Sequence, residues 1–300
     1  MNPNSTKPNK VLVVGAAGGA ARNGLAPTFN RMAAQFFGTD HGIQLLGCDI
    51  KPENEDLRRL YDRYHGDMDI TVAGRKWDSI LPGVDLIVNA TMAPPNSDEP
   101  TQKRIHVDGM RNLCTLAQKH GVPRIVHFST FSVYEDPPYN HYVEKMGKIL
   151  TEDTVECPPS PRSTYARTKY GAEEILRQYV TGAEGDGTPI EGAVGVFTGI
   201  TSTCFPPWGE IVKQHEWLKM QYALDHIDEK EARQLHVYTN VLDVGRFAWH
   251  LGLLPPERVF IDINVPIETY FCSQDHPANS WSINKAKDRL GYVPEFSLGR

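Results

Sequence analysis

The sequence lacks any long hydrophobic run, has few cysteines and carries no excess of positive charge. Its longest apolar stretch, VLVVGAAGGAA, is far shorter than the ~20 residues that span a bilayer. The opening residues, MNPNSTKPNK, are polar and contain no apolar core, so they do not have the pattern of a secretory signal peptide. A formal net charge of −6 provides no electrostatic basis for binding nucleic acid or an anionic membrane. We therefore expect a cytoplasmic protein that acts on a small molecule, with no nucleic acid or membrane partner.

The cysteines and histidines lack the spacings of a disulfide framework or a metal site. No two of the five cysteines are close in the sequence, and the eleven histidines include no i, i+4 pair. We interpret the cysteines as reduced, partly buried thiols of an intracellular protein, and we predict no metal centre. The cysteines are Cys48, Cys114, Cys157, Cys204 and Cys272.

What the sequence does contain, over its first two-thirds, is an alternation of short apolar runs with longer segments of helical periodicity. The apolar runs are rich in β-branched residues and leucine, which is typical of parallel strands buried on both faces. They are KVLVV (10–14), IQLLGC (43–48), DLIVNA (85–90), RIVHFS (124–129) and PIEGAVGVF (189–197). Helical spacing occurs within 101–121 and again after Ser163. The alternation predicts an α/β fold, namely a Rossmann-type doubly wound parallel sheet.

The alternation weakens after residue 198. The predicted elements there are a loop at TSTCFPPWGE, a helix over 211–227, a helix near LDVGRFAWHLGLL, and strands at LHVYT (235–239) and RVFIDI (258–263). We expect a dinucleotide-binding Rossmann domain over 1–198, with a return segment at about 235–263. A smaller, mixed and discontinuous substrate lobe would occupy 199–300.

A glycine-rich turn follows the first predicted strand directly. In GAAGGAARNG, Gly15, Gly18 and Gly19 would let the backbone approach a pyrophosphate and direct the N-terminus of the next helix toward it. Small residues also form ordinary tight turns, so this motif alone is weak. The second strand, however, ends at Asp49, and a carboxylate there can bind the adenosine ribose and repel the 2′-phosphate of NADP. Together the two features favour an NAD site.

Two features depart from the usual dinucleotide fingerprint. Ala21 stands at the third glycine position, and Asp49 lies farther along the chain than the usual ~20 residues. Because Pro27 suits the first turn of a helix, we expect the helix to begin near Ala26, after a longer loop. Arg22 could then reach a phosphate, which keeps NADP as an alternative cofactor.

A tyrosine and a lysine lie one helical turn apart in STYARTKYGAEEIL. In a helix, Tyr165 and Lys169 share one face. A nearby ammonium stabilises a phenolate and lowers the pKa of the tyrosine, ordinarily ~10, so that the phenol can act as an acid or base. The alternative is a surface Tyr–Lys pair on an amphipathic helix, and for so short a motif that alternative is the more common one.

Ordered motifs along nearly the whole chain resemble those of extended short-chain dehydrogenases/reductases in the NAD-dependent epimerase/dehydratase family. They are, in order, VLVVGAAGG, CDI, GDMDI, GVDLIVNAT, VPRIVHFSTFSVYED, TEDTVECPPSPRSTYARTK, NVLDVGRF and AKDRLGYVPEFSL. Each motif is weak by itself, but their shared order is specific. The resemblance implies a cytoplasmic Rossmann-fold oxidoreductase that uses NAD, and it makes a homodimer a plausible assembly.

The resemblance also implies roles for individual residues. Tyr165 and Lys169 match the active-site tyrosine and its lysine, which also holds the nicotinamide ribose. Thr130 matches the serine or threonine that hydrogen-bonds the reacting oxygen, although it could instead cap the strand end, as could Ser129 or Ser132. The remaining matches are cofactor contacts: Asp67 to the acidic residue beside adenine, and Ala90 and Thr91 to the strand-end residues beside the cofactor.

The sequence departs from the family pattern at several positions. His106 stands where the family's helix often begins with asparagine, so an ordered water is expected to be lost. The segment PPYNHYVEKMGKI is an insertion, which suggests a local lid or lobe. No arginine-proline pair follows GAVGVFTGI, and His236 stands where nucleotide-sugar enzymes often present an arginine, so a nucleotide diphosphate on the substrate is in doubt. Phe131 and Ser132 replace the acidic pair of dehydratases, which predicts no 4,6-dehydratase activity.

The combined hypothesis is an enzyme that transfers hydride at a secondary alcohol or ketone, with Tyr165 as acid/base, Lys169 as its modulator and Thr130 orienting the substrate oxygen. The first candidate is an epimerase-type oxidoreductase of a sugar or nucleotide sugar. The alternative is an NAD(P)-dependent dehydrogenase or reductase of a non-nucleotide hydroxy or keto substrate. A non-catalytic NAD(P)-sensing protein is a third class, but an intact Thr–Tyr–Lys set argues against it.

Overall fold

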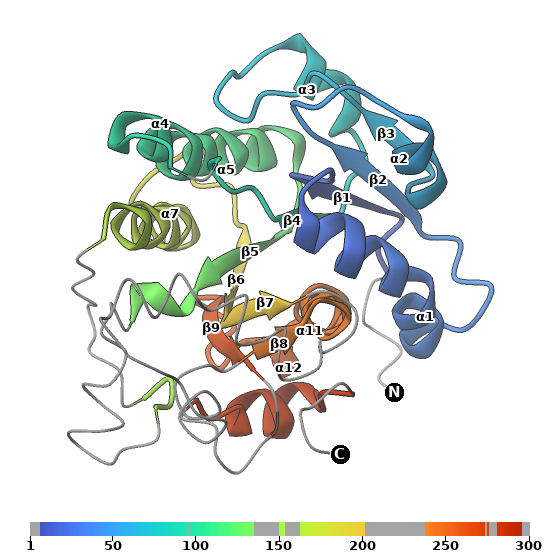
Figure 1. Ribbon diagram of the computed structural model, residues 1–300, viewed down its shortest axis with the longest axis vertical. Helices are drawn as coiled ribbons and strands as arrows, with labels where there is room; N and C mark the ends of the chain where they lie inside the picture. Colours follow the sequence, from blue (N-terminus) through green and yellow to red (C-terminus); the bar gives the residue numbers. More distant parts are fainter. Residues whose placement is uncertain are drawn as a thin grey trace, which may run out of the picture.

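A seven-stranded sheet lies at the centre of the structure, a computed structural model that describes residues 7–94, 96–134, 150–153, 163–201, 238–273, 275 and 281–295. Its strand order is β3-β2-β1-β4-β5-β6-β9, and every neighbouring pair is parallel (Figure 1). The strands are β1 (Lys10–Val14), β2 (Gln44–Cys48), β3 (Arg63–His65), β4 (Leu86–Asn89), β5 (Arg124–Thr130), β6 (Glu191–Phe197) and β9 (Ile267–Cys272). Since the order reverses between β1 and β4, the predicted doubly wound Rossmann-type sheet is confirmed.

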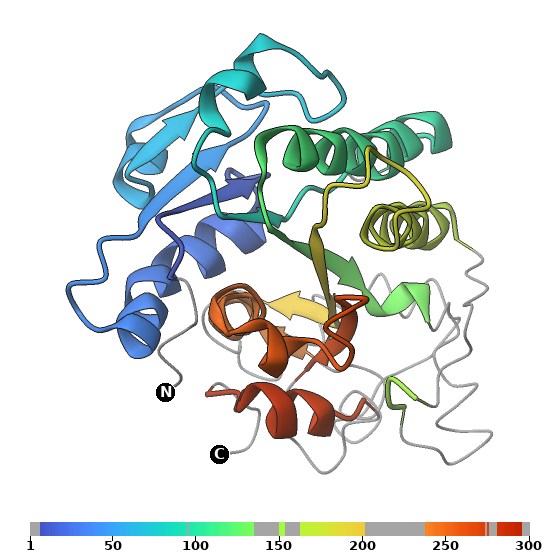
Figure 2. The same ribbon diagram turned by 180° about the vertical axis from the view of Figure 1, so that it is seen from behind.

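Helices cover both faces of the sheet (Figures 1 and 2). On one face α1 (Ala26–Phe37) packs against α11 (Val241–Leu253), and on the other α5 (Gly109–His120) packs against α7 (Thr164–Val180). The shorter helices are α2 (Glu55–Leu60), α3 (Arg75–Ile80), α4 (Glu99–Lys103) and α12 (Pro256–Val259), with single turns η1 (Ala21–Leu25), η2 (Arg104–Asp108), η3 (Phe131–Val133) and η4 (Ala286–Leu290). Among the described residues, no helix is long and apolar enough to cross a membrane.

The strands of the sheet centre are buried on both sides, which explains their continuous apolar runs. In β1, Val11 and Val13 pack in the α1/α11 layer, while Leu12 and Val14 pack in the α5/α7 layer. None of these four side chains is more than 2% exposed. The five apolar runs that predicted strands in the first two-thirds of the chain overlap β1, β2, β4, β5 and β6.

The predicted strand at RVFIDI (258–263) is wrong. Pro255 and Pro256 begin the short helix α12, which takes up the first two residues of that run. Ile261 and Ile263 then lie 65% and 63% exposed in a connecting segment. The edge of the sheet beside β6 is formed instead by β9, so the segment that returns to the sheet extends beyond the predicted 235–263.

The other carboxyl-terminal predictions are only partly visible. Of LHVYT, the last two residues belong to β8 (Tyr238–Asn240), which pairs with β7 (Gly199–Thr201) in a separate two-stranded sheet. The predicted helix over 211–227, the insertion PPYNHYVEKMGKI and His236 lie outside the described residues. So do two of the cysteines, while Cys48, Cys114 and Cys272 are buried free thiols.

The α-helix after the glycine turn begins at Ala26, as predicted, with Pro27 in its first turn, but a helical turn and not a loop precedes it. The π-helical turn η1 leads without a loop into α1. Pro27 has no N–H to bond to the preceding turn, so the hydrogen-bond pattern shifts before it. Gly24 also packs directly on α11, where a Cβ atom would lie 2.2 Å from the carbonyl oxygen of Val241. The expectation of a longer loop is therefore wrong, and the long spacing to Asp49 reflects a longer helix.

Candidate active site

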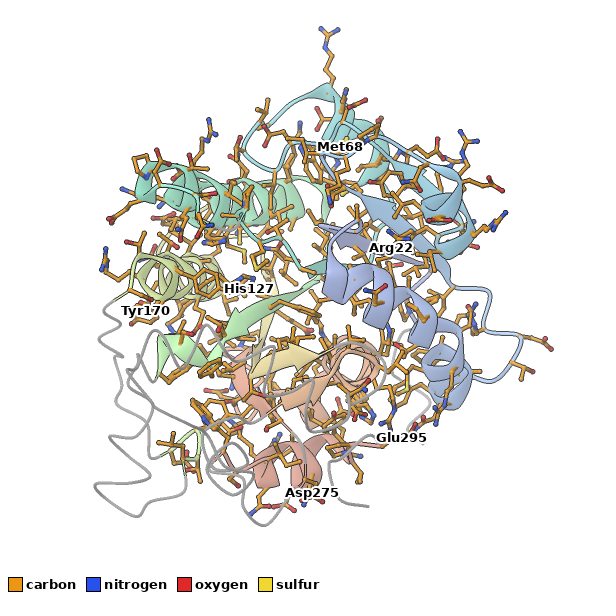
Figure 3. All side chains as sticks on the ribbon, viewed as in Figure 1. Arg22, Met68, His127, Tyr170, Asp275 and Glu295 are labelled. Carbon is orange, nitrogen blue, oxygen red and sulfur yellow. The ribbon has the colours of Figure 1, made fainter. Side chains whose placement is uncertain are left out.

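The candidate site residues gather where the strand order reverses, at the carboxyl ends of β1, β2, β4 and β5. Open parallel sheets bind ligands at this position because the strand ends and the following helix N-termini meet there. Figure 3 shows Arg22 on the first helix after β1, and His127 in the interior near α7. The residues predicted from the glycine turn and from the Tyr–Lys helix thus belong to one edge of the sheet.

The glycine turn packs directly on the segment after β4. Gly15 has a φ of 82°, and a Cβ atom there would lie 2.9 Å from the backbone nitrogen of Thr91 and the carbonyl carbon of Ala90. Both its φ and its surroundings therefore require glycine. A Cβ at Gly18 would lie 3.1 Å from the Gly15 oxygen, whereas Gly19 faces open space. The turn thus brings the predicted cofactor residues of β1 and β4 together.

Asp49 is held at the rim of the glycine turn. One carboxylate oxygen accepts a hydrogen bond from the Ala17 N–H at 3.0 Å, and the other accepts one from the Lys51 N–H, also at 3.0 Å. The side chain is half-buried, so it remains accessible from the turn. Its distance along the chain from the first glycine does not remove it from the site.

Asp67 lies beside the end of β2. The next residue, Met68, donates its backbone N–H to the Asp49 carbonyl at 2.9 Å. Asp67 itself is exposed and has a φ of 55°, and its carbonyl accepts a hydrogen bond from Lys76 at 3.1 Å. Both acidic residues that were predicted to contact the adenosine half of the cofactor are therefore neighbours.

Arg22 has an acidic partner. Its guanidinium forms an ion pair with Asp56 at 2.9 Å, and both side chains are exposed, by 46% and 62%. A cation that pairs with a carboxylate is partly neutralised, and it must leave that partner to bind a phosphate. This pairing weakens the NADP alternative that Arg22 suggested.

Helix α7 presents Tyr165 and Lys169 to the end of β5. Ser163 caps the helix by accepting the Ala166 N–H at 3.2 Å, which fixes the register of the first turn. Lys169 is 3% exposed and donates to the carbonyl of Phe128 on β5 at 2.5 Å. The pair is therefore not a surface pair, since its lysine is buried against the sheet.

The phenol of Tyr165 reaches the segment after β4 and the end of β5. Its hydroxyl lies 4.0 Å from the Met92 sulfur, and Met92 directly follows Thr91. Burial raises the pKa of Tyr165, while a hydrogen bond with the Thr130 side chain partly opposes the rise. The two catalytic candidates Tyr165 and Thr130 are thus in contact. The lowering of the tyrosine pKa that we expected from Lys169 is not found, because burial outweighs it and Thr130 is the group that opposes the rise.

Thr130 also caps the turn that follows β5. Its hydroxyl accepts a hydrogen bond from the Ser132 N–H at 3.4 Å. Thr130 therefore both caps the turn and contacts Tyr165. Ser129, one of the two other capping candidates, turns instead to the opposite side of the strand and donates to Glu173. In the part of the chain that the structure describes, Thr130 is the one of these three hydroxyls that interacts with Tyr165.

Glu173 is a residue that the sequence reasoning missed. It lies one helical turn after Lys169 and is fully buried, and it accepts hydrogen bonds from Ser129 and, at 2.9 Å, from Tyr134. Burial raises its pKa to about 7, and burial lowers the pKa of Lys169 to about 8, which the Glu173 charge opposes. The helical spacing Tyr165–Lys169–Glu173 was the signal that could have identified it.

Two buried histidines line the same region. His106 is 3% exposed and lies edge-on to the Tyr165 ring, with 5.8 Å between the ring centres. His127 is 2% exposed, and its Nδ1 lies 3.4 Å from the side-chain nitrogen of Asn89. Burial and the nearby Lys169 charge lower the pKa of both imidazoles. Within the described residues, no three metal-ligating side chains come together.

A family model for the NAD dependent epimerase/dehydratase family matches residues 11–190 of this chain. The chain belongs to this family. The resemblance drawn from the motifs is thereby confirmed, and so is NAD as the family's cofactor. Members of the family are NAD-dependent enzymes. The comparison with curated proteins gives no match.

Solved structures share the fold at low sequence identity. A short-chain dehydrogenase/reductase superfamily protein from Agrobacterium tumefaciens with bound NAD is 17% identical, with a TM-score of 0.65 over 96% of this chain and 93% of that chain. Uronate dehydrogenase from Agrobacterium tumefaciens is 18% identical, with a TM-score of 0.63 over 97% and 86%. A UDP-galactose 4-epimerase is 12% identical, with a TM-score of 0.63 over 96% and 94%. At these identities the likeness concerns the fold alone.

Proposed function

We propose that this protein is an NAD-dependent oxidoreductase of the epimerase type, acting at a secondary alcohol of a sugar-like substrate. The observation that carries the proposal is the meeting of two groups at one sheet edge. The glycine turn, with Asp49 at its rim, packs on the segment after β4, and Tyr165 of the catalytic helix contacts that same segment through Met92.

The residues present fit NAD. Gly19 leaves space for a ligand to approach the backbone, and the helix that follows offers N–H groups without partners in its own first turn. Asp49 supplies a carboxylate for the ribose hydroxyls, and its charge disfavours a 2′-phosphate. Two apolar side chains, Ile50 and Met92, are 62% and 61% exposed beside these groups, and a dinucleotide would cover apolar surface there. When bound, NAD supplies the hydride chemistry.

The protein's own residues would handle the proton and the orientation. The Tyr165 phenol is protonated at neutral pH, and burial raises its pKa further above that range. It would donate a proton to a carbonyl oxygen or, in reverse, accept one from the alcohol. Thr130 would hold the same oxygen by a hydrogen bond. The buried Lys169 would hold the nicotinamide ribose, and its charge would favour the phenolate while the proton is away.

Epimerase-type chemistry returns the hydride to the opposite face, so the cofactor need not leave. A dehydrogenase exchanges its cofactor in each cycle. The longer glycine loop that favoured exchange is absent, because η1 leads without a loop into α1. The short turn supports a retained NAD and therefore the epimerase candidate.

A second candidate is a dehydrogenase of a sugar or sugar acid without a nucleotide. It is supported by the lack of an arginine after β6, where the chain continues as Thr198 and Gly199. Without a cation there, a diphosphate has one anchor fewer. The fold is also similar to that of uronate dehydrogenase from Agrobacterium tumefaciens.

Identification of the bound nucleotide tests both candidates. The protein is purified without added cofactor and denatured, and the released nucleotide is identified by chromatography. Released NAD, together with interconversion of sugar epimers without net NADH formation, supports the epimerase. An empty protein that reduces added NAD in proportion to a sugar or sugar acid supports the dehydrogenase. If neither NAD nor NADP binds, the proposed function is wrong.

A further inference from the structure

His106 is buried between the segment after β4 and the catalytic helix α7. It lies within the π-helical turn η2, which joins α4 to α5 and packs against α7. One imidazole nitrogen faces each neighbour. Nε2 lies 3.0 Å from the backbone nitrogen of Ala93, and Nδ1 lies 2.9 Å from the hydroxyl of Thr168 on α7. All three residues are buried, with exposures of 3%, 5% and 5%.

These two contacts determine where the single proton of a neutral imidazole lies. A backbone N–H can only donate, so Nε2 must accept from Ala93 and carries no proton. The Thr168 hydroxyl donates its hydrogen to the Tyr165 carbonyl at 3.0 Å, so it accepts from Nδ1–H. The proton is therefore on Nδ1. Burial lowers the pKa of His106 to about 3, which keeps this neutral form at ordinary pH.

The resulting hydrogen-bond chain runs from the cofactor side of the site to the catalytic residue. It begins at Ala93, two residues after Thr91, passes through His106 and Thr168, and ends on the backbone of Tyr165. The same two segments also touch through Met92 and the Tyr165 hydroxyl. The imidazole therefore connects the segment after β4 to α7 through its two nitrogens.

We propose that His106 is a positioning residue that fixes the segment after β4 against the catalytic helix, through Nε2 on one side and Nδ1–H on the other. This role deepens the proposed function, on which its effect on NAD binding rests. The family's asparagine could not reproduce it, because an asparagine amide reaches about as far as Nδ1 and leaves the Ala93 N–H buried without its acceptor. Where we expected only the loss of an ordered water, the imidazole supplies a direct link between the two segments.

The two arms can be removed separately. In His106→Asn the amide can still donate to Thr168 but cannot reach Ala93. In His106→Gln the side-chain oxygen can accept from Ala93, while the donor to Thr168 is lost. Thr168→Val removes the second arm from the other side and keeps the volume of the threonine.

Three measurements test the proposal. Nitrogen chemical shifts of labelled histidine should show His106 neutral and protonated on Nδ1. Amide hydrogen exchange at Ala93 should be faster in His106→Asn and protected in His106→Gln. Titration with NAD should show binding roughly three- to tenfold weaker in His106→Asn, as expected for one lost hydrogen bond, and largely restored in His106→Gln. Thermal unfolding of each variant separates this pattern from a general loss of stability.

Several results would overturn the proposal. One is an imidazole protonated on Nε2. Another is unchanged Ala93 exchange and NAD affinity in His106→Asn. If His106→Asn does not fold, the tautomer in the unmodified protein and the effect of Thr168→Val still decide. If the unmodified protein binds no NAD, the proposed function fails, whereas the tautomer and exchange data still test whether His106 joins the two segments.

Discussion

At the scale of single residues, the buried charges on α7 control the chemistry that we propose. Lys169 and Glu173 share one face of the helix, and both are removed from solvent. Burial moves their pKa values toward each other, to about 8 and about 7. Above pH about 7 the glutamate is therefore largely ionised and stabilises the ammonium, whose loss above pH about 8 would weaken the hold on the ribose.

Glu173→Gln is expected to shift the alkaline limit of NAD binding to lower pH. Without the Glu173 charge the pKa of Lys169 falls further, so the ammonium loses its proton earlier as the pH rises. NAD dissociation constants measured by calorimetry at a series of pH values give the midpoint. Glu174→Gln is a matched control, because Glu174 is paired with Arg177 at 3.1 Å on the more exposed side of the same helix. Identical midpoints in the two variants would contradict the role of Glu173.

Tyr165→Phe is expected to abolish turnover while NAD still binds, because the phenolic proton serves only the chemistry. Lys169→Ala should impair both, since the lysine is assigned to the ribose as well as to the phenol. Steady-state rates and NAD titrations on the same preparations separate the two effects. A Tyr165→Phe protein that keeps most of its rate would show that another group is the acid/base.

Asp49 is expected to determine the preference for NAD over NADP. Asp49→Asn keeps an oxygen that can accept from the Ala17 N–H but removes the charge, so it should chiefly relieve the repulsion of the 2′-phosphate. Asp49→Ala should also reduce the difference between the affinities for NAD and NADP. In addition it should lower the affinity for NAD, because the Ala17 N–H of the glycine turn loses its acceptor. Titration of each variant with both nucleotides measures this. Equal affinities in the unmodified protein would mean that Asp49 does not reach the ribose.

At the scale of secondary-structure elements, the first helix and α11 approach each other so closely that only glycine fits. A Cβ at Gly24 would lie 2.2 Å from the Val241 oxygen, and a Cβ at Gly245 would lie 2.2 Å from the Gly24 oxygen. This contact holds η1, and with it the end of the glycine turn, against the second layer. Because the clashing atoms belong to the backbone, no side-chain rotation could make room for a Cβ atom at either glycine.

Gly24→Ala and Gly245→Ala are each expected to destabilise the fold by roughly 1–3 kcal/mol, because the helices must separate to admit a methyl group. Gly74→Ala is the control, since a Cβ there meets no atom within 4 Å and the backbone is extended. Urea unfolding curves measure the differences. A Gly24→Ala protein as stable as the control would show that the two helices can move apart at little cost.

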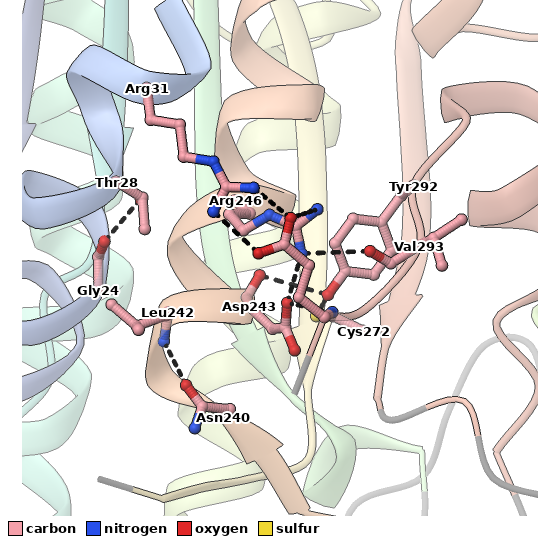
Figure 4. A network of polar contacts seen from close by, with 11 residues as sticks. Gly24, Thr28, Arg31, Asn240, Leu242, Asp243, Arg246, Cys272, Tyr292 and Val293 are labelled. Atoms are coloured by element: carbon pink, nitrogen blue, oxygen red, sulfur yellow. Dashed lines mark hydrogen bonds and ion pairs between the residues drawn. The ribbon is translucent and has the colours of Figure 1, made fainter. Parts of the chain in front are cut away.

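At the scale of the whole molecule, a buried ion-pair network joins segments that are far apart in the sequence (Figure 4). Arg246 and Asp243 on α11 form a pair at 2.6 Å, with side-chain exposures of 9% and 2%. Glu295 pairs with Arg246 at 3.1 Å and with Arg31 of α1, and its N–H donates to Asp243 at 3.0 Å. The Tyr292 hydroxyl adds a hydrogen bond to the Asp243 carbonyl at 3.3 Å. The network attaches the carboxyl-terminal segment to both helices of one layer.

Asp243→Asn is expected to lower the free energy of unfolding by about 3 kcal/mol, since it leaves the buried Arg246 charge without its closest partner. Breaking the network at its exposed end should cost less, so Arg31→Gln serves as the comparison, with an exposed side chain paired to Glu295. Chemical unfolding followed by fluorescence and by circular dichroism gives both values. Equal losses in the two variants would mean that burial does not set the strength of this network.

Features formed by residues that are close together in the sequence were predictable from the sequence. β1 follows from the four consecutive apolar positions Val11–Val14. The cap at Ser163 and the Tyr165–Lys169 spacing follow from helix signals. The glycine turn and Asp49 are likewise local signals at strand ends. The family resemblance added Thr130, Ala90 and Thr91. Their spacing in the sequence does not reveal that Thr130 lies beside Tyr165, or that Ala90 and Thr91 lie beside Gly15.

Other features depend on residues that meet only in the folded chain. Whether 258–263 or β9 completes the sheet depends on which run lies beside β6 after the turn of α12, and both runs are rich in strand-forming residues.

The sequence by itself determined strands β1, β2, β4, β5 and β6, the glycine turn and the Tyr–Lys helix, because each of these is carried by residues that are neighbours in the chain. Only the tertiary structure decided that Glu173 is buried beside Lys169 and that His106 joins Ala93 to Thr168. The physical reason is that burial and hydrogen-bond partners are set by segments distant in the sequence.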